Sequence, residues 1–422
     1  MKNYERLTCR LCESKNLTAQ LVFRPTPAAD SYMADSAVCK ALKRIPLTLM
    51  FCEACGNTQL SHVIDGEEVY LNYIYESEST LGLGSHFKGA AQTVMTKFHP
   101  RIGGLVLDIG SNDGILLEHF KNLGMKVLGV DPMPGIAEKA SKRGIPTVSK
   151  FFDEAFVSSF AKDYEPPAVI CSNNLVADTD DLISFIKNVK KLMNKDTLFF
   201  FETFYFYFQV KNNVWDFTYH EHYTYFTIKP LQSFLSKLGL DLIDVEPNIT
   251  KGGSIRCAVQ LHEGNRQTLE SVNTFIELER MEGFQSKILF RGYSYKIDKA
   301  KKEFNKFISA LIPTDKIVGY GASATTTTLV YNYELEGKIK YFVDDYKAKQ
   351  GLYFPGTDVL VYNPEKLAAD GCKYVVIFAW RYWQKIVQNN MDFLNKGGVF
   401  VVPLPELRVI TKDNLDGFSV DS

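Results

Sequence analysis

Four of the eight cysteines occur as two close pairs, a spacing that could hold a metal ion. The pairs are Cys9 with Cys12 and Cys52 with Cys55, and the chain between them is long enough to fold back. Two C-x-x-C pairs can present four thiolates to one tetrahedral ion, which is typical of zinc sites. A redox dithiol is the alternative, although neither pair has the βαβ context of such motifs. Because four sulfur ligands leave no position for water, we predict a structural zinc.

Two of the seven histidines flank a glutamate in the aromatic stretch WDFTYHEHYTYF, from Trp215 to Phe226. The triplet His220-Glu221-His222 lacks the H-E-x-x-H spacing that places two imidazoles on one helix face, which weakens a metal site as an interpretation. If the segment is extended, His220 and His222 share one side and Glu221 points away. We predict a general base in this segment, with a metal fragment and plain packing as the alternatives.

A glycine loop predicts a ligand site of another kind. In LVLDIGSNDG a short apolar strand leads through Asp108 to Gly110 and Gly114, and the next predicted strand ends at Asp131. The dinucleotide fingerprint G-x-G-x-x-G needs a further, central glycine to admit a pyrophosphate, and this loop lacks it. S-adenosylmethionine has no pyrophosphate, so the loop and Asp131 favour that methyl donor. A glycine turn without a ligand is the alternative.

A second glycine loop lies in the last third of the chain. In IVGYGAS, Gly319 and Gly321 precede the predicted helix TTTTLVYNY, and the following strand ends at Asp344. A helix N-terminus after such a loop suits a phosphate group. A NAD site is the alternative, weakened by the lack of a clear third glycine.

Tyrosines crowd the stretch VYLNYIYESESTLGLGSHF, residues 69–87. Tyrosines on a polar loop just before a ligand-binding domain can line the mouth of its site, so Tyr75 and His86 are candidate site residues. An aromatic packing face is the alternative.

The elements that must position these groups alternate between strand and helix, which predicts a doubly wound α/β sheet. The strands in AVICSNN and TLFFFET end near Asn173, Asn174 and Glu202, whose side chains should point into the ligand crevice. The strands DLIDVE and IRCAVQLH follow each other without a helix and therefore predict an antiparallel edge.

The remaining segments suggest the domain division. A helical connector is expected before the second glycine loop, packed on the core and not a coiled coil, because Gly283 and Gly292 interrupt its pattern. A single helix is expected over Tyr382–Asn395 between two strands. We expect a zinc-binding domain, a cofactor domain, the connector and a C-terminal Rossmann-like domain at residues 1–68, 69–264, 265–311 and 312–422.

Composition excludes some classes of protein. The 48 basic and 49 acidic residues give a net charge of −1, so the totals carry no electrostatic footprint for nucleic acid. No stretch reaches the roughly 18 apolar residues of a membrane helix. The single cysteines do not form a secreted disulfide framework. A cytoplasmic protein without membrane or nucleic-acid partners is therefore expected.

Several motifs occur together in one order: the paired C-x-x-C, DIGSNDG, YHEHYTYF, KGGSIR, VGYGAS, VDDYKAKQG with PGT, and IFAW. With these motifs the chain resembles the sugar C-methyltransferases that act on nucleotide-linked 4-keto-6-deoxy hexoses, most like the 3-C-methyltransferases. The resemblance implies a class I methyltransferase (Rossmann-like) core, a small N-terminal zinc-binding domain and a C-terminal Rossmann-like α/β domain that helps to hold the nucleotide sugar.

The resemblance also implies roles for single residues. His222 corresponds to the base, Glu221 and Tyr219 support the keto group or its enolate, and Tyr75 is similar to a tyrosine that reaches the sugar. The chain departs from the family at Ala177-Asp178, where relatives commonly carry a histidine, so a second-base role at that position is in doubt.

The motifs and the resemblance together give two sets of expected contacts. The residues expected to bind S-adenosylmethionine are Asp108, Gly110, Ser111, Asn112, Asp113, Gly114, Asp131, Pro132, Asn173 and Asn174. Those expected to bind the nucleotide sugar are His86, Lys251, Gly253, Ser254, Arg256, Gly319, Gly321, Ser323, Asp344 and Trp380.

The expected reaction is C-methylation through an enolate, with His222 removing the proton at carbon-3 beside the ketone. A sugar O-methyltransferase would use the same donor without a ketone, and a zinc-knuckle nucleic-acid binder is the nonenzymatic rival. The sequence leaves open whether the nucleotide is dTDP or GDP. It also leaves open the oligomeric state, for which a monomer is the working expectation.

Overall fold

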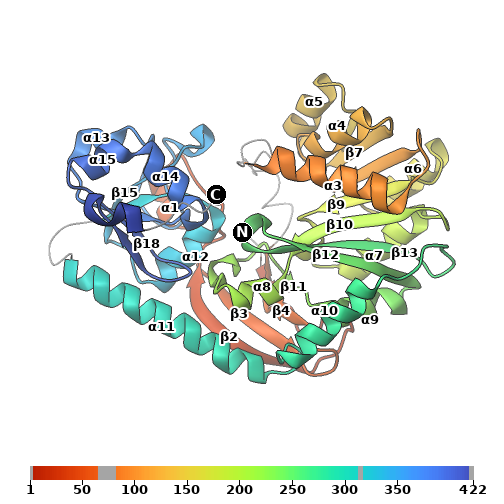
Figure 1. Ribbon diagram of the computed structural model, residues 1–422, viewed down its shortest axis with the longest axis horizontal. Helices are drawn as coiled ribbons and strands as arrows, with labels where there is room; N and C mark the ends of the chain where they lie inside the picture. Colours follow the sequence, from red (N-terminus) through yellow and green to blue (C-terminus); the bar gives the residue numbers. More distant parts are fainter. Residues whose placement is uncertain (1–2, 65–81, 312–316, 418–422) are drawn as a thin grey trace.

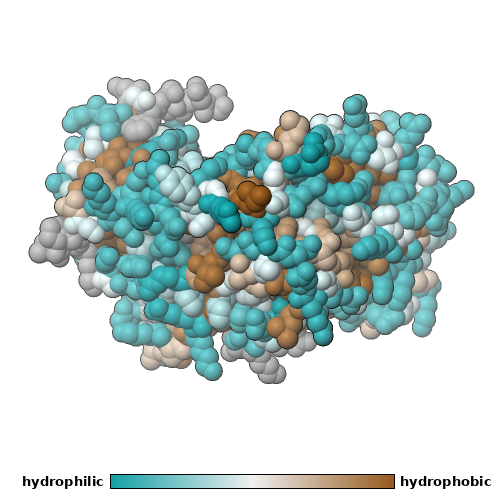
Figure 2. Space-filling view, turned by 90° about the horizontal axis from the view of Figure 1, so that it is seen from below, coloured by the Kyte–Doolittle hydropathy of each residue, from teal (hydrophilic) through white to brown (hydrophobic). Residues whose placement is uncertain are grey.

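The computed structural model of the protein describes residues 3–64, 82–311 and 317–417. Figure 1 shows a small N-terminal sheet at the bottom centre, a large α/β domain on the right and a second α/β domain on the left. On the face seen from below, hydrophobic residues form small groups separated by hydrophilic ones (Figure 2). Within the described ranges, no helix has the length and apolar character needed to cross a membrane.

The N-terminal part is built around an antiparallel sheet with the strand order β11-β4-β3-β2. Its elements are β2 (Leu17–Thr26), α1 (Ser36–Lys40), β3 (Ile45–Cys52), β4 (Thr58–Leu60) and β11 (Thr224–Tyr225). A separate antiparallel pair is formed by β1 (Asn3–Glu5) and β5 (His62–Ile64). Because β11 belongs to the H-E-H segment, that segment completes the sheet of the zinc-binding part.

The central domain contains a seven-stranded sheet in the order β12-β13-β10-β9-β6-β7-β8. Its strands are β6 (Leu105–Ile109), β7 (Lys126–Asp131), β8 (Thr147–Ser149), β9 (Val169–Asn173), β10 (Leu198–Phe204), β12 (Leu240–Asn248) and β13 (Ser254–Leu261). Six strands run in the same direction, and β13 lies antiparallel between β10 and β12. This is the class I methyltransferase arrangement, so the expected fold class and antiparallel strands are confirmed.

Helices cover both faces of this sheet, as its fully buried strand β10 requires. They are α3 (Leu83–Phe98), α4 (Ile115–Asn122), α5 (Pro134–Lys142), α6 (Glu154–Asp163), α7 (Leu182–Leu192), α8 (Phe206–Lys211) and α9 (Ile228–Lys237). Short 3-10 turns are η2 (Val176–Asp178), η3 (Trp215–Phe217) and η4 (Thr250–Gly252). The chain order reverses at β6, so the carboxyl ends of β6 and β9 open a crevice for a ligand.

The connector consists of α10 (Glu270–Met281) and α11 (Ile288–Leu311), which runs beneath the molecule from the central to the C-terminal domain (Figure 1). Gly283 ends the first helix region with a φ of 82°. The expectation that Gly292 also interrupts the pattern is wrong, since it lies inside α11. A glycine inside a helix costs only about 1 kcal/mol, and the buried side chains of Phe290 and Tyr293 on either side of it favour the continuous helix.

The C-terminal domain has a six-stranded sheet in the order β16-β15-β14-β17-β18-β19, parallel except for β19. Its strands are β14 (Ile317–Tyr320), β15 (Ile339–Val343), β16 (Val361–Tyr362), β17 (Tyr374–Ile377), β18 (Val399–Val402) and β19 (Arg408–Ile410). Its helices are α12 (Ala324–Asn332), α13 (Lys366–Asp370), α14 (Trp383–Asn389) and α15 (Met391–Asn395), with 3-10 turns η5 (Lys347–Lys349), η6 (Trp380–Tyr382) and η7 (Lys412–Gly417). The single helix expected over Tyr382–Asn395 is broken, because Asn390 leaves helical geometry with φ −124° and ψ 33°.

Helix α12 joins the C-terminal domain to the other two parts. The Thr327 hydroxyl donates to the Ala29 carbonyl at 3.0 Å, and the Thr328 hydroxyl donates to the Thr218 carbonyl at 2.7 Å. Threonine side chains in a buried helix need such acceptors. The run of threonines therefore docks α12 onto both the zinc-binding part and the segment that carries the H-E-H triplet.

A buried ion pair forms a second joint between the domains. Asp216 is fully buried and accepts hydrogen bonds from Trp380 Nε1 at 2.9 Å and from Arg381 Nη2 at 2.9 Å. The Arg381 guanidinium also lies 4.2 Å from the centre of the Phe217 ring. Residues of η6 are thus fixed against η3, directly before the H-E-H triplet.

Candidate active site and zinc centre

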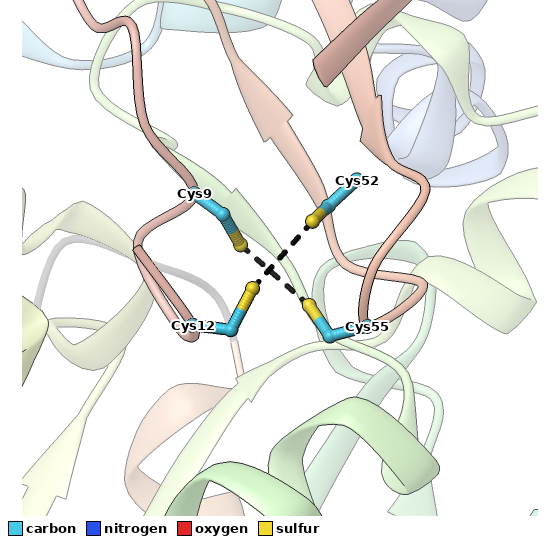
Figure 3. Close-up of side chains that lie close together, drawn as sticks. All are labelled: Cys9, Cys12, Cys52 and Cys55. Atoms are coloured by element: carbon cyan, nitrogen blue, oxygen red, sulfur yellow. Dashed lines mark hydrogen bonds between the residues drawn. The ribbon is translucent and has the colours of Figure 1, made fainter. Parts of the chain in front are cut away.

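The four paired cysteines converge on one point (Figure 3). Cys9 Sγ lies 3.6 Å from Cys55 Sγ, Cys12 Sγ lies 3.6 Å from Cys52 Sγ, and all four sulfurs lie within 4.8 Å of one another. Four thiolates bound at about 2.3 Å from one zinc ion would lie about 3.8 Å apart in a regular tetrahedron. The geometry fits zinc. A redox dithiol would need only two of these thiols, so the convergence of all four favours the metal site. With four protein ligands the zinc is structural, as predicted.

Arg10, between the first two cysteines, reaches from the zinc centre to the active-site loops. Its side chain is fully buried. Nη1 donates to the carbonyls of Leu60 at 2.8 Å and Tyr223 at 3.3 Å, and Nε donates to Asp180 Oδ1 at 3.0 Å. Tyr223 directly follows the H-E-H triplet, and Asp180 follows η2. The zinc-binding loop therefore braces both segments.

A cavity of about 490 Å³ opens at the carboxyl ends of β6 and β9. Most of the residues expected to bind the methyl donor line it: Asp108, Gly110, Ser111, Asn112, Asp131, Pro132, Asn173 and Asn174. Asp113 and Gly114 do not. Asp113 is fully buried and its Oδ1 accepts from the Ile115 amide, while a Cβ on Gly114 would lie 2.9 Å from Ile145 Cγ2. These two residues shape the start of α4 and do not face the cavity.

The glycine loop is held open by Asp131. Its carboxylate accepts from the amide of Asn112 at 2.9 Å and from the amide of Met133 at 3.0 Å. Gly110 has a φ of 72°, which only glycine adopts at little cost, and a Cβ there would lie 3.1 Å from Leu175 Cδ2. The backbone of the loop is therefore exposed to the cavity.

Three residues that line this part of the cavity each have a buried polar atom with no hydrogen-bond partner among the described residues. These atoms are Asp108 Oδ1, Ser111 Oγ and Asn173 Nδ2. Burial, followed by the nearby Asp131, raises the pKa of Asp108 to about 8. Unpaired buried groups of this kind destabilise a protein unless a ligand or water satisfies them. A ligand with an amino group and ribose hydroxyls, such as S-adenosylmethionine, supplies the matching donors and acceptors.

The same cavity continues to the H-E-H segment, where Tyr219, Glu221 and His222 line it. The segment is not extended: the His222 amide donates to the Tyr219 carbonyl at 3.1 Å and closes a turn. The expectation that His220 and His222 share one side is therefore wrong, and so is the expectation that Glu221 points away. His220 is fully buried on the other side, where Nε2 lies 3.2 Å from the carbonyls of both Ile45 and Pro46.

His222 is held as a neutral imidazole. Its Nδ1–H donates to the Phe217 carbonyl at 3.1 Å, which leaves the lone pair on Nε2, where the Tyr219 hydroxyl donates at 2.7 Å. The ring stacks on Phe204 at 4.3 Å between centroids. Burial, with a smaller effect from the Lys251 charge, lowers the pKa of His222 to about 3. At neutral pH the imidazole is therefore uncharged and has its lone pair on Nε2.

Two carboxyl groups line the same cavity as this imidazole. Asp178 Oδ1 lies 3.9 Å from His222 Nε2. Burial, followed by the nearby Glu221, raises the pKa of Asp178 well above its usual range. Burial, followed by the nearby Asp30, raises the pKa of Glu221 to about 8, against the opposing charge of Lys349. Tyr75, the remaining predicted catalytic residue, lies outside the described residues.

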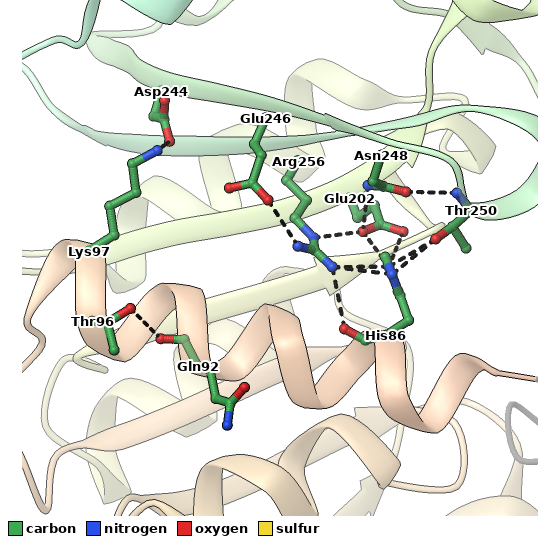
Figure 4. Close-up of polar contacts among 10 residues, drawn as sticks. All are labelled: His86, Gln92, Thr96, Lys97, Glu202, Asp244, Glu246, Asn248, Thr250 and Arg256. Atoms are coloured by element: carbon green, nitrogen blue, oxygen red, sulfur yellow. Dashed lines mark hydrogen bonds and ion pairs between the residues drawn. The ribbon is translucent and has the colours of Figure 1, made fainter. Parts of the chain in front are cut away.

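Two residues predicted to bind the substrate, His86 and Arg256, belong to an internal network (Figure 4). Glu202 accepts from His86 Nε2 at 2.7 Å, Arg256 Nε at 3.0 Å and Asn248 Nδ2 at 3.1 Å. Burial alone would raise the pKa of Glu202, but the His86 hydrogen bond and the Arg256 charge lower it. Glu202 and Arg256 are not among the described residues that line the cavity at the Gly110 loop, which corrects the expectation that Glu202 points into it. The network pins α3 to the sheet. Ser254 is likewise buried, and its hydroxyl donates to the Thr250 carbonyl at 3.0 Å.

A second cavity of about 500 Å³ lies between η4 and η6, the turn that begins at Trp380. Four of the expected substrate contacts line it: His86, Lys251, Gly253 and Trp380. Lys251 also lines the first cavity and has a φ of 54°, a left-handed conformation that is uncommon for lysine and typical of functional sites. The lining includes Arg381, whose Nε is buried without a hydrogen-bond partner among the described residues. Among the described residues of this lining there are basic and aromatic side chains and no carboxylate.

The second glycine loop lines neither cavity, which corrects the expectation for Gly319, Gly321, Ser323 and Asp344. A Cβ on Gly319 would lie 2.4 Å from Phe342 Cδ1, and one on Gly321 would lie 2.5 Å from Ala379 Cβ. Asp344 accepts from the Ala322 amide at 2.5 Å, and Ser323 caps α12. These residues close the loop against its own domain.

Sequence reasoning missed other lining residues. Arg381 directly follows the predicted Trp380 and could have been found as its neighbour. Phe151 and Phe152 line the first cavity just after β8, at the same edge of the sheet as Gly110. The rule that ligands bind at strand ends would have found them had the three-residue strand β8 been recognised.

Comparison with known proteins agrees with this architecture. Residues 9–70 match a family described as "Putative zinc binding domain", residues 88–245 match "Methyltransferase domain", and residues 249–405 match "C-methyltransferase C-terminal domain". A curated relative, the C-methyltransferase NovU of Streptomyces niveus, is 27% identical over 408 residues, which cover 96% of this chain and 97% of NovU.

Matches to solved structures are more distant. The PH0226 protein of Pyrococcus horikoshii OT3 is 12% identical over 47% of this chain and 100% of its own, with a TM-score of 0.38. Magnesium protoporphyrin IX methyltransferase of Synechocystis PCC 6803 with bound S-adenosylmethionine is 11% identical over 43% of this chain and 80% of its own, with a TM-score of 0.33. The three domain families occur in this order, and a C-methyltransferase relative aligns along nearly its whole length. Both findings support S-adenosylmethionine-dependent C-methyltransferase activity for this chain.

Proposed function

We propose that the enzyme methylates a carbon beside a ketone, at carbon-3 of a nucleotide-linked 4-keto-6-deoxy sugar. The observation that carries the proposal is that one cavity contains both the Gly110 loop and the neutral imidazole of His222. A methyl transfer to carbon needs a nucleophilic carbon, and a ketone acidifies the hydrogen on its neighbouring carbon. An imidazole with its lone pair facing the cavity is suited to remove that hydrogen.

The donor and the chain have separate tasks in this reaction. Bound S-adenosylmethionine would supply an electrophilic methyl group, held by the Gly110 loop, Asp131 and the unpaired atoms of Asp108 and Asn173. His222 would accept the carbon-3 proton at Nε2, while Phe217 keeps the ring in the required tautomer. The Tyr219 hydroxyl donates its hydrogen bond to His222 Nε2 in this structure. When a substrate binds beside His222, the hydroxyl would instead donate to the developing enolate oxygen.

The second cavity supports a nucleotide diphosphate as the carrier of the sugar. Lys251 and Arg381 offer positive charge to phosphate groups, and Trp380 offers an aromatic face to a base. Because Lys251 lines both cavities, a diphosphate beside it would direct the sugar toward His222. We assign the diphosphate to this cavity and not to the closed Gly319–Gly321 loop.

The test is hydrogen exchange at carbon-3 in deuterated water, followed by mass spectrometry and NMR of the methylated product. The substrates are a panel of dTDP- and GDP-linked 4-keto-6-deoxy sugars. The wild-type enzyme is expected to exchange and then methylate carbon-3, whereas His222→Asn should do neither. His262→Asn, whose side chain is half exposed, is the matched control. Exchange in His222→Asn at the wild-type rate refutes the base assignment, and methylation of a reduced sugar at oxygen refutes the keto-sugar proposal.

A further inference from the structure

One polar group at the centre of the active site has no role in the reaction described so far. Asp178 lines the first cavity, and its Oδ1 is buried without a hydrogen-bond partner among the described residues. The same oxygen lies 3.9 Å from His222 Nε2. A buried oxygen without a hydrogen-bond partner is destabilising, so its presence at this place points to a bond with a ligand.

The separation between Asp178 and His222 is set by the backbone and not by a bond between the two side chains. The Asp178 amide donates to the Leu175 carbonyl at 2.9 Å and closes the η2 turn. The Tyr223 amide donates to the Ala177 carbonyl at 2.8 Å. The second of these bonds joins Ala177, the residue before Asp178, to Tyr223, the residue after His222. The two side chains therefore face the cavity together at a fixed distance.

The other acidic and hydroxyl groups of this wall already have partners. Glu221 accepts from the Asp30 backbone and faces the Lys349 charge. The Tyr219 hydroxyl donates to His222. Asp178 faces Glu221 and Lys251 at longer range. Of these groups, the Oδ1 atom of Asp178 is the one without a hydrogen-bond partner among the described residues.

We propose that Asp178 is a catalytic acid that protonates the keto oxygen of the sugar while His222 removes the hydrogen from the adjacent carbon. The proposal rests on the proposed function. Neighbouring carbons lie about 1.5 Å apart, so an acid and a base about 4 Å apart can reach the carbonyl oxygen and the adjacent C–H bond of one ring. Burial keeps the pKa of Asp178 high, which holds the proton on the carboxyl group at neutral pH.

The proton balance closes over the cycle. The carbon-3 hydrogen leaves as a proton on His222 Nε2, and the carboxyl proton of Asp178 moves to the keto oxygen, which gives an enol. When the enol carbon forms its bond to the methyl group, the sulfur–methyl bond breaks, the C=O bond re-forms, and the hydroxyl proton returns to Asp178. His222 releases its proton to water.

The test compares zinc-loaded, full-length wild type with Asp178→Asn, which keeps the size of the side chain but cannot transfer a proton. The probe is a dTDP-linked or GDP-linked 4-keto-6-deoxy sugar that the wild type exchanges at carbon-3. Asp181→Asn is the matched control, because Asp181 caps α7 through the Ser184 amide on the same loop and asparagine caps equally well. Calorimetric affinity for S-adenosylmethionine checks that each variant is folded.

The acid assignment predicts that Asp178→Asn slows both carbon-3 exchange and kcat by about 10²- to 10⁴-fold, with KM and donor affinity close to wild type. Exchange at the wild-type rate overturns it. A rise in KM with kcat unchanged also overturns it, since Asp178 would then only bind a sugar hydroxyl. If the wild type exchanges none of the sugars, the proposed function itself fails, and that outcome is separate from a failure of the acid assignment.

Discussion

At the scale of single residues, the two histidines of the H-E-H triplet differ in what surrounds them. His222 faces the ligand cavity, whereas His220 is buried against two carbonyls of β3, more than 170 positions away in the chain. The sequence therefore indicated a functional segment but not which side chain faces the ligand. Which histidine faces the cavity depends on a turn that is fixed by contacts of His220 with the N-terminal sheet. A rule about local residue spacing contains no information about such contacts.

The buried state of His220 predicts a pH-dependent stability. Burial lowers the pKa of His220 from 6.5 to about 4, so between these values the unfolded chain binds a proton that the folded chain does not. Stability must fall as the pH falls through this window. Glutamine at position 220 can donate to the same carbonyls but does not titrate. On acidification from pH 7 to pH 4, the free energy of unfolding of His220→Gln should therefore fall by up to about 3 kcal/mol less than that of the wild type.

Urea denaturation across this pH range measures the difference. The control is His262→Gln, because the half-exposed His262 lies at the surface beside Asp241. A pH slope in His220→Gln equal to that of the wild type would contradict the prediction.

At the scale of elements, two glycine loops with similar sequences have opposite properties. The loop at Gly110 is open to a cavity, while the loop at Gly321 is closed by Ala379 and Asp344. The alternation of strand and helix, the glycine turns and the acid at the end of the next strand were all predictable, because they depend on local pattern. The closure of the second loop was not, because it depends on side chains from strands that follow later in the chain.

Substitution by alanine distinguishes the two loops. Gly110→Ala forces a left-handed conformation that costs about 1–2 kcal/mol and places a methyl group against Leu175, so the dissociation constant for S-adenosylmethionine should rise by about tenfold. Gly321→Ala would overlap Ala379 and should lower thermal stability while the donor affinity stays unchanged. Calorimetric titration and thermal unfolding of both variants measure these effects. Equal donor affinities in the two variants would refute the distinction.

At the scale of the whole molecule, the proposed active site is assembled by all three parts of the chain. The central domain supplies the donor cavity, the C-terminal domain fixes the segment before His222 through Asp216, and the N-terminal sheet takes up β11 directly after it. The three-domain division was predictable from motifs. The way in which the domains interlock was not, since it rests on pairings between residues that are far apart in sequence.

The position of Arg10 has a consequence for the metal. The cysteines on either side fix this arginine, and the arginine supports the loops of Asp178 and His222. A zinc ion outside the proposed substrate site would therefore help to set the distance between Asp178 and His222. Chelated enzyme should keep its affinity for S-adenosylmethionine yet lose about 100-fold in turnover, and Arg10→Met with its zinc retained should lose as much. Full turnover after chelation would show that the zinc stabilises only its own domain. If turnover does fall after chelation, the supply of zinc in the cell would control the rate of methylation, because the position of the Arg10 side chain depends on the bound zinc.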